Sequence, residues 1–286
     1  LPFIIVLYEL LFFKGRAMPG SAKYGKFLFL LPFMLTLLIV PVTRLTAGVD
    51  GFVGEIYSLT KHHTPLSRYD YFLTQTRVIA TYMRLYFLPV NQNLDYDYPI
   101  FGPILNPQVL LSLLLHLSLI SFGIYLSVRS RKTPILRAVS FGVFFFYVAI
   151  SMESSIFPIP MIICEYRAYL PSAGAFSALS VGFYLLSDKI RHPGFKKALP
   201  AVAVLIIVAL SGATYARNAL WKDTVTLWED VVKKSPRNPR AHAQLAFSYK
   251  NKGQFDMAVK HYMKALELNP SYAGYNTGDL YMATGQ

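Results

Sequence analysis

Two carboxylates and one guanidinium lie close together in a proline-rich stretch between two hydrophobic segments: Glu153, Glu165 and Arg167. A guanidinium offers paired N–H donors that match a phosphate group and keeps its charge, so Arg167 is a candidate for binding a phosphate. A carboxylate that reaches a hydroxyl can act as a general base or hold a metal ion, which makes Glu153 and Glu165 catalytic candidates. The structural alternatives are an ion pair between Arg167 and a glutamate, a lipid-headgroup contact, or a helix cap.

Two further arginines lie in a predicted helix, residues 69–88, that Pro89 ends. Helical spacing puts polar residues on one face (Thr74, Arg77, Thr81, Arg84) and larger apolar ones on the other (Phe72, Ile79, Tyr82, Met83, Tyr86), with Gln75 as the exception. This pattern predicts a helix in the membrane interface, with arginines toward headgroups and aromatic rings toward lipid. Arg77 and Arg84 either line a groove for a phosphate-bearing ligand or extend to the headgroups without one.

The histidines and the cysteine do not suggest a metal centre. His62 and His63 are adjacent, so their side chains diverge in any regular element, and no second cluster with ligand spacing accompanies them. We therefore expect no metal site. His116 lies in the middle of a hydrophobic segment, where a hydrogen bond between helices is the expected role. Cys164 is the only cysteine, which excludes an intrachain disulfide.

The elements that must position these residues are membrane helices. The 286 residues are 54% hydrophobic and only 15% charged, with a mean hydropathy of +0.38. A soluble domain carries about 25% charged residues, so the composition predicts a polytopic membrane protein. Six hydrophobic segments are expected, at about 1–13, 27–49, 106–128, 135–152, 168–187 and 198–216. Asn106 and Pro107 form the start signal of the third segment, and Thr133 and Pro134 that of the fourth.

Loop charges predict the topology of these segments. The net charge of +13 lies largely in short loops after the first, third and fifth segments, which favours membrane orientation over nucleic-acid binding. These loops are expected in the cytoplasm, and the 50–105 loop, the 153–167 stretch and the C-terminal tail on the other side. The first segment is too short to span a membrane, and the last repeat is incomplete. We therefore expect the sequence to be part of a longer protein.

From residue 217 the composition is that of a soluble helical domain, which divides the chain into residues 1–216 and 217–286. A 34-residue period predicts tetratricopeptide repeats: one partial, one complete, one partial. Small residues let two antiparallel helices approach, aromatic residues fill the gap between them, and a proline ends the second helix. The predicted packing positions are Trp228, Leu245, Ala246, Tyr249, Gly253, Ala258, Tyr262, Ala265 and Pro270.

Four motifs together resemble one family: Leu73-Thr74-Gln75, the Asp95–Pro99 turn, the Glu165-x-Arg167-x-Tyr-Leu-Pro-Ser-x-Gly174 element, and Arg217-Asn218-x-x-Trp221 before the repeats. The chain resembles the transmembrane and tetratricopeptide repeat-containing proteins, most closely bacterial relatives. Members often have histidine where Tyr166 stands. The resemblance implies an all-α fold: a polytopic membrane domain of the C-type glycosyltransferase kind, followed by a tetratricopeptide α-solenoid.

The resemblance also implies an activity. Such enzymes transfer a sugar, mannose or a related hexose, from a polyprenyl-phosphate carrier to a hydroxyl on the non-cytoplasmic side. The family's catalytic acid is expected after the first membrane helix, upstream of Leu1, so the resemblance assigns no catalytic base to a residue of this sequence. No protein-bound cofactor is implied, and the question of a divalent metal stays open. The implied location is a bacterial inner membrane, with the repeats in the periplasm binding an acceptor or partner protein.

A second interpretation is a membrane-anchored repeat scaffold without chemistry, since tetratricopeptide repeats are binding modules. The absence of a glycine-rich phosphate loop from the sequence agrees with a lipid-linked donor rather than a nucleotide sugar.

Overall fold

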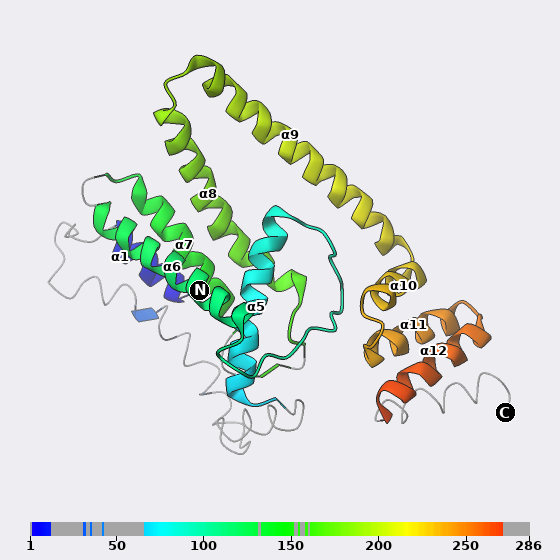
Figure 1. The fold of residues 1–286 in the computed structure, drawn as a ribbon. Coiled ribbons are helices and arrows are strands. Elements are labelled where there is room, and N and C mark those ends of the chain that lie inside the picture. Colours follow the sequence, from blue (N-terminus) through cyan, green and yellow to red (C-terminus); the bar gives the residue numbers. More distant parts are fainter. Residues whose placement is uncertain are drawn as a thin grey trace. The chain divides into compact units, whose positions relative to one another are not determined.

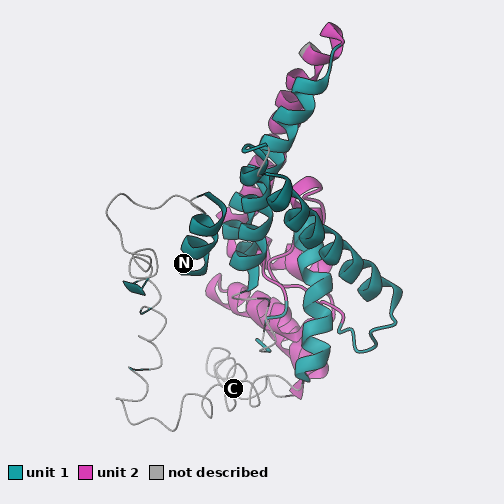
Figure 2. Ribbon diagram, turned by 90° about the vertical axis from the view of Figure 1, so that its left-hand side faces the viewer, with its two compact units in different colours: residues 1–83, 100–162, 166–191 teal, residues 84–99, 163–165, 192–286 magenta. Residues whose placement is uncertain are grey.

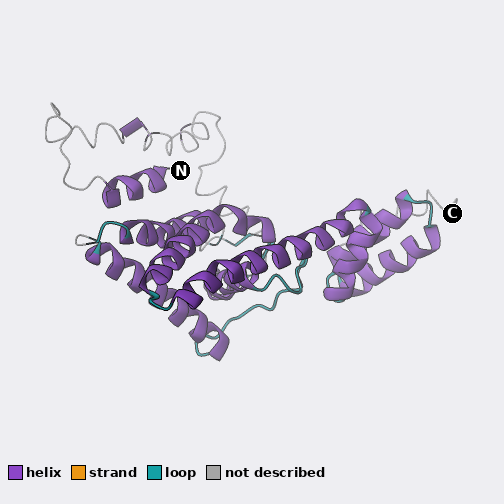
Figure 3. Cartoon of the chain, turned by 90° about the horizontal axis from the view of Figure 1, so that it is seen from above, coloured by secondary structure: helices purple, strands orange, loops and turns teal. Residues whose placement is uncertain are grey.

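The computed structural model describes residues 2–12, 31–32, 35, 42, 66–130, 133–151, 154, 158–159 and 161–270 (Figure 1). Every regular element in these ranges is helical, which confirms the predicted all-α class (Figure 3). The elements are α1 (Pro2–Phe12), α5 (Arg68–Phe87), α6 (Pro107–Arg129), α7 (Leu136–Ser151), η2 (Glu165–Ala168), α8 (Tyr169–Lys189), α9 (Pro193–Asn218), η3 (Ala219–Lys222), α10 (Thr224–Lys234), α11 (Pro239–Asn251) and α12 (Phe255–Leu268).

The chain divides into two compact units (Figure 2). The first contains residues 1–83, 100–162 and 166–191, and the second contains residues 84–99, 163–165 and 192–286. This division by spatial contacts differs from the predicted division by composition at residue 216. The reason is that the 84–99 segment and helix α9 belong to the same unit as the repeats.

Three helical stretches in the described residues are long and apolar enough to cross a membrane: Pro107–Arg129, Glu165–Lys189 and Pro193–Lys222. They match the third, fifth and sixth predicted segments. Helices α1 and α7 are apolar but shorter, with 11 and 16 residues. The predicted segment at 27–49 lies almost wholly outside the described residues.

The helix boundaries follow local capping chemistry. Asn106 accepts a hydrogen bond from the Gln108 N–H with Pro107 in the first turn, which confirms the predicted start of α6. The fourth segment begins later than predicted, because a turn of i→i+3 hydrogen bonds at Pro134 precedes α7. Helix α9 begins five residues earlier than predicted, because Pro193 lies in its first turn, where proline is tolerated.

Glycines let α7 and α8 cross at close range in the first unit. A Cβ atom on Gly142 would lie 2.5 Å from the carbonyl oxygen of Gly174, and one on Gly174 would lie 2.6 Å from that of Gly142. No side chain fits at either distance, so the two backbones are in direct contact. Ser140 adds a hydrogen bond of 2.9 Å from its hydroxyl to the Gly123 carbonyl of α6. Small residues at helix crossings are the usual packing device in membranes.

Helix α5 differs from the predicted interfacial helix. Tyr82, expected toward lipid, is fully buried, and Thr74 and Thr81 on the expected polar face are buried as well. Gln75 and Thr76 are also buried. The amphipathic pattern failed because the polar side chains of α5 find hydrogen-bond partners inside the protein instead of facing headgroups. For example, the Thr74 hydroxyl accepts from the Phe101 N–H at 3.0 Å.

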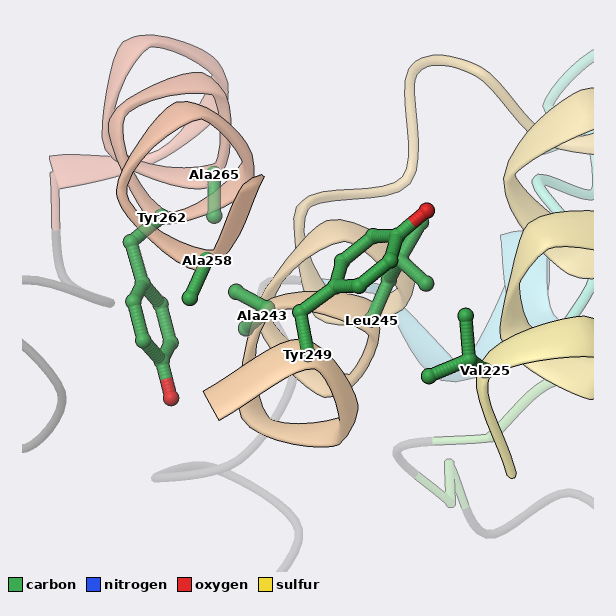
Figure 4. Close-up of a cluster of buried hydrophobic side chains, with 8 residues drawn as sticks. Val225, Ala243, Leu245, Tyr249, Ala258, Tyr262 and Ala265 are labelled. Carbon is green, nitrogen blue, oxygen red and sulfur yellow. The ribbon is translucent and has the colours of Figure 1, made fainter. Parts of the chain in front are cut away.

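The repeat helices α10, α11 and α12 share one apolar core in the second unit (Figure 4). Ala258 and Ala265 of α12 are buried against α11, and Tyr249 and Tyr262 are buried beside them. Gly253 follows α11 with φ +73°, the left-handed conformation that ends a helix. The other predicted packing positions follow the same scheme: Leu245 and Ala246 are buried, Trp228 packs against the core, and Pro270 comes after the end of α12.

Candidate functional site

Arg167 lies in η2, at the entrance to α8. Its Nη1 donates a hydrogen bond of 2.8 Å to the Met161 carbonyl, and its guanidinium lies 6.0 Å from the centre of the Tyr166 ring. The guanidinium therefore holds the irregular segment that precedes η2. Glu153 lies outside the described residues.

Gln75 holds the next carbonyl of the same segment from α5. Its Nε2 donates to the Ile162 oxygen at 2.9 Å, and its side chain is only 2% exposed. Consecutive carbonyls, those of Met161 and Ile162, are thus bound by two polar side chains from different elements. This arrangement satisfies irregular backbone beside membrane helices. It also explains the polar residue at position 75 that the helical pattern left unexplained.

Glu165 uses one oxygen of its carboxylate to bind a turn in the 84–99 segment. Its Oε1 accepts a hydrogen bond of 2.7 Å from the Asn93 N–H and one of 2.5 Å from the Tyr96 hydroxyl. Burial raises the pKa of the Tyr96 hydroxyl, and the hydrogen bond to Glu165 raises it further, so the phenol remains a donor. These contacts give Glu165 a structural role that differs from the ion pair or helix cap considered from the sequence, because it holds the turn at residues 91–99.

The same turn is bound by helix α10 and the loop after it. The Ser235 hydroxyl oxygen accepts from the Asn93 side-chain amide at 2.8 Å and from the Asp97 N–H at 3.0 Å. Lys234 Nζ donates to the Gln92 carbonyl at 2.8 Å. Asn93 and Ser235 are each 2% exposed, so the hydrogen bond between their side chains is shielded from water.

Two ion pairs complete the contact between turn and repeat. Arg240 at the start of α11 binds Asp95 at 2.5 Å, and the Asp95 side chain is 7% exposed. Arg237 lies 3.4 Å from Asp97, and both side chains are well exposed. Sequence reasoning identified the turn but missed its partners. No local signal near Asp95 points to residues almost 150 positions away.

The arginines of α5 differ in their environment. Arg84 Nη1 donates to the Val90 carbonyl at 3.3 Å. Arg77 is partly buried, and its Nε is shielded from solvent without a hydrogen-bond partner in the described part of the protein. A buried guanidinium N–H without an acceptor is costly. Of the three candidate arginines, Arg77 is the one with a shielded side-chain nitrogen that lacks a hydrogen-bond partner among the described residues.

His116 joins three helices of the first unit. Its Nε2 lies 2.8 Å from the Thr76 carbonyl of α5, and its Nδ1 lies 3.0 Å from the Tyr147 hydroxyl of α7. Because a carbonyl only accepts, Nε2 carries the hydrogen and Nδ1 accepts from the tyrosine. Both ring nitrogens are thus used between helices, as the sequence predicted. His62 and His63 lie outside the described residues.

These features define a class: an α-helical membrane protein whose candidate residues precede a tetratricopeptide repeat. The tetratricopeptide repeat family model matches residues 239–272. This match confirms the repeat predicted from the 34-residue period.

Several proteins similar to this chain are named protein O-mannosyl-transferases. Protein O-mannosyl-transferase TMTC1 of Mus musculus is 22% identical over 268 residues, covering 90% of this chain and 28% of that protein. Protein O-mannosyl-transferase F38B6.6 of Caenorhabditis elegans is 27% identical over 241 residues, covering 82% of this chain and 33% of that protein. Protein O-mannosyl-transferase TMTC3 of Homo sapiens is 25% identical over 162 residues, covering 56% of this chain and 17% of that protein.

The similarity to transmembrane and tetratricopeptide repeat proteins that the motifs predicted is thereby confirmed. The chain spans a third or less of the length of these relatives. No solved structure matches the chain.

Proposed function

We propose that this chain is part of a membrane glycosyltransferase. The enzyme would transfer mannose or a related hexose from a polyprenyl-phosphate carrier to a protein acceptor. The observation that carries this proposal is the similarity over 90% of the chain to a protein named as a protein O-mannosyl-transferase. The membrane helices agree with a lipid-linked donor, and the repeat agrees with a protein acceptor.

The donor phosphate is proposed to bind Arg77 together with Arg167. A phosphate oxygen would satisfy the buried Nε of Arg77, which lacks an acceptor in the described residues. Arg167 donates to the Met161 carbonyl, and its guanidinium keeps its positive charge at any physiological pH. A fixed positive charge near the departing phosphate stabilises the negative charge that develops there. Arg84, which donates to the Val90 carbonyl, is proposed only as a weaker candidate for contacting the phosphate.

Glu165 is proposed as a structural residue, since two donors already use its carboxylate oxygen. The catalytic base is proposed to come from a part of the protein outside this sequence. No protein-bound cofactor is proposed, and the need for a divalent metal is a question for the transfer assay.

Transfer is proposed to occur on the non-cytoplasmic side, in the periplasm of a bacterium with the protein in its inner membrane. Basic residues gather in the loops after the first, third and fifth predicted segments, which supports this orientation. The repeat, on the opposite side from those loops, would then bind the acceptor where the sugar is delivered.

The test is sugar transfer from labelled polyprenyl-phosphate mannose to acceptor protein in membranes that contain the full-length protein. Arg77→Gln and Arg167→Gln are each expected to reduce transfer about 100- to 1000-fold, with partial recovery in the lysine variants. Arg237→Gln, at an exposed arginine of the repeat, is the matched control, and its rate of sugar transfer should be that of the unmodified protein. Absence of transfer from the unmodified protein with every hexose donor would favour a non-catalytic scaffold instead.

A further inference from the structure

Two histidines of neighbouring repeat helices meet through their ring nitrogens. Nδ1 of His242 in α11 lies 3.1 Å from Nδ1 of His261 in α12, and the rings stack with centres 5.3 Å apart. Nε2 of His242 lies 3.0 Å from the Pro236 carbonyl oxygen. The Tyr249 ring also stacks on His261, at 5.7 Å. The pair thus joins α11, α12 and the loop before α11.

This geometry fixes how many hydrogens the pair can hold. The Pro236 carbonyl only accepts, so Nε2 of His242 carries a hydrogen. In the neutral ring Nδ1 of His242 then has a lone pair, and Nδ1 of His261 must donate to it. One extra proton can enter at Nε2 of His261 without breaking either bond. A second would have to enter at Nδ1 of His242, between two nitrogens that already share one hydrogen.

Charged groups from α10 and α12 surround the pair. Lys260, Lys264 and Glu267 line a cavity of about 430 Å³ together with the two histidines. Glu267 is bound by Lys264 at 2.9 Å, and Glu229 of α10 accepts from the Tyr249 hydroxyl at 2.5 Å. Burial lowers the pKa of His261, and the proximity of His242 and of the Lys260 ammonium lowers it further, against the opposing effect of the Glu229 carboxylate.

We propose that the His242–His261 contact is an acid-sensitive lock between α11 and α12, closed at neutral pH and opened by mild acid. In an unfolded repeat both histidines take up protons near pH 6.5. The closed pair holds at most one extra proton, so below that pH the open state binds more protons and is favoured. The ratio of closed to open repeat then falls by up to about tenfold for each pH unit.

The first test is backbone hydrogen exchange across residues 239–268 of the full-length protein between pH 7.5 and 5.0, corrected for the intrinsic pH dependence of exchange. Opening of α11 and α12 is expected to rise steeply below about pH 6. The double variant His242→Gln with His261→Gln keeps a donor for Pro236 and a side-chain contact but cannot titrate, so its opening should not depend on pH. His192→Gln, at an exposed histidine outside the repeat, should behave as the unmodified protein does.

A second measurement decides the proposal if the double variant fails to fold. Exchange of the ring C–H of each histidine, followed by mass spectrometry of the unmodified protein, counts the protons that the pair takes up. We expect the two rings to take up protons in two separate steps, the second accompanying the opening of α11 and α12 seen by backbone exchange. Independent titration of both rings near pH 6.5, or opening that changes less than about twofold over this range, would overturn the proposal.

Discussion

Asp95 and Arg240 are 145 residues apart in the chain and form a hydrogen-bonded ion pair of 2.5 Å. Removing the Asp95 charge leaves the Arg240 guanidinium, which is only partly exposed, without this counterion. Asp95→Asn is therefore expected to destabilise the contact between turn and repeat by about 2 kcal/mol, less than a fully buried pair because Arg240 is partly exposed. Thermal unfolding of the full-length protein, followed by protease cleavage within the repeat, measures this loss.

The matched control for this pair is Asp97→Asn. Its partner Arg237 has a side chain that is 84% exposed, so the change should cost less than about 0.5 kcal/mol. Equal effects at positions 95 and 97 would contradict the assignment of the Asp95 pair as the principal contact.

The Glu165→Gln variant distinguishes a structural role of the Glu165 carboxylate from a catalytic role. If Glu165 holds the turn, the variant should lose about 1–2 kcal/mol of stability, because glutamine is a weaker acceptor for Asn93 and Tyr96. Tyr96→Phe should cost a similar amount, and the double variant should cost less than the sum. Transfer by the Glu165→Gln enzyme should stay within about tenfold of normal, whereas loss of a general base costs about 100-fold or more.

Ala258→Glu tests the packing of the repeat. Ala258 is fully buried against α11, so a glutamate there would place a charge without a partner in the apolar core. The expected loss is about 3–5 kcal/mol, enough to unfold the repeat. Rapid proteolysis of the tail with normal membrane insertion is the expected result. Met263→Glu, at an exposed position of the same helix, should leave the tail resistant.

Two glycines of α8 should respond differently to one added methyl group. A Cβ on Gly174 would meet the Gly142 carbonyl at 2.6 Å, whereas a Cβ on Gly182 would meet nothing within 4 Å. Gly174→Ala is expected to cost about 1–3 kcal/mol, because α7 and α8 must move apart. Gly182→Ala should be neutral or slightly stabilising. Thermal stability in detergent compares the two, and equal effects would rule out the close crossing.

The orientation of the chain is tested with alkaline phosphatase, which is active only outside the cytoplasm. A fusion after Asn251, in the repeat, should be active, and a fusion after Arg131, in a basic loop, should be nearly inactive. The reverse pattern would place the repeat in the cytoplasm.

Local sequence signals predicted the elements well but not their long-range partners. The cap at Asn106 and the 34-residue period of the repeat each depend on residues close together, and both were visible in the sequence. The burial of α5 was missed because Thr74 and Gln75 bind backbone groups 27 and 87 residues away. Glu165 was first considered beside Arg167 for the same reason. Its observed donors, Asn93 and Tyr96, lie about 70 residues upstream.

Because the turn and its partners lie far apart in the chain, the ribosome synthesises the turn well before the residues that bind it. Asn93 leaves the ribosome 142 residues before Ser235, which at about 5–20 residues per second is a delay of roughly 7–28 s. During this interval Asn93 and Asp95 are synthesised while their partners are not, and water must solvate them. The second unit therefore cannot complete its folding until translation has passed Arg240. A ribosome stalled before that codon would leave the nascent turn accessible to proteases and chaperones.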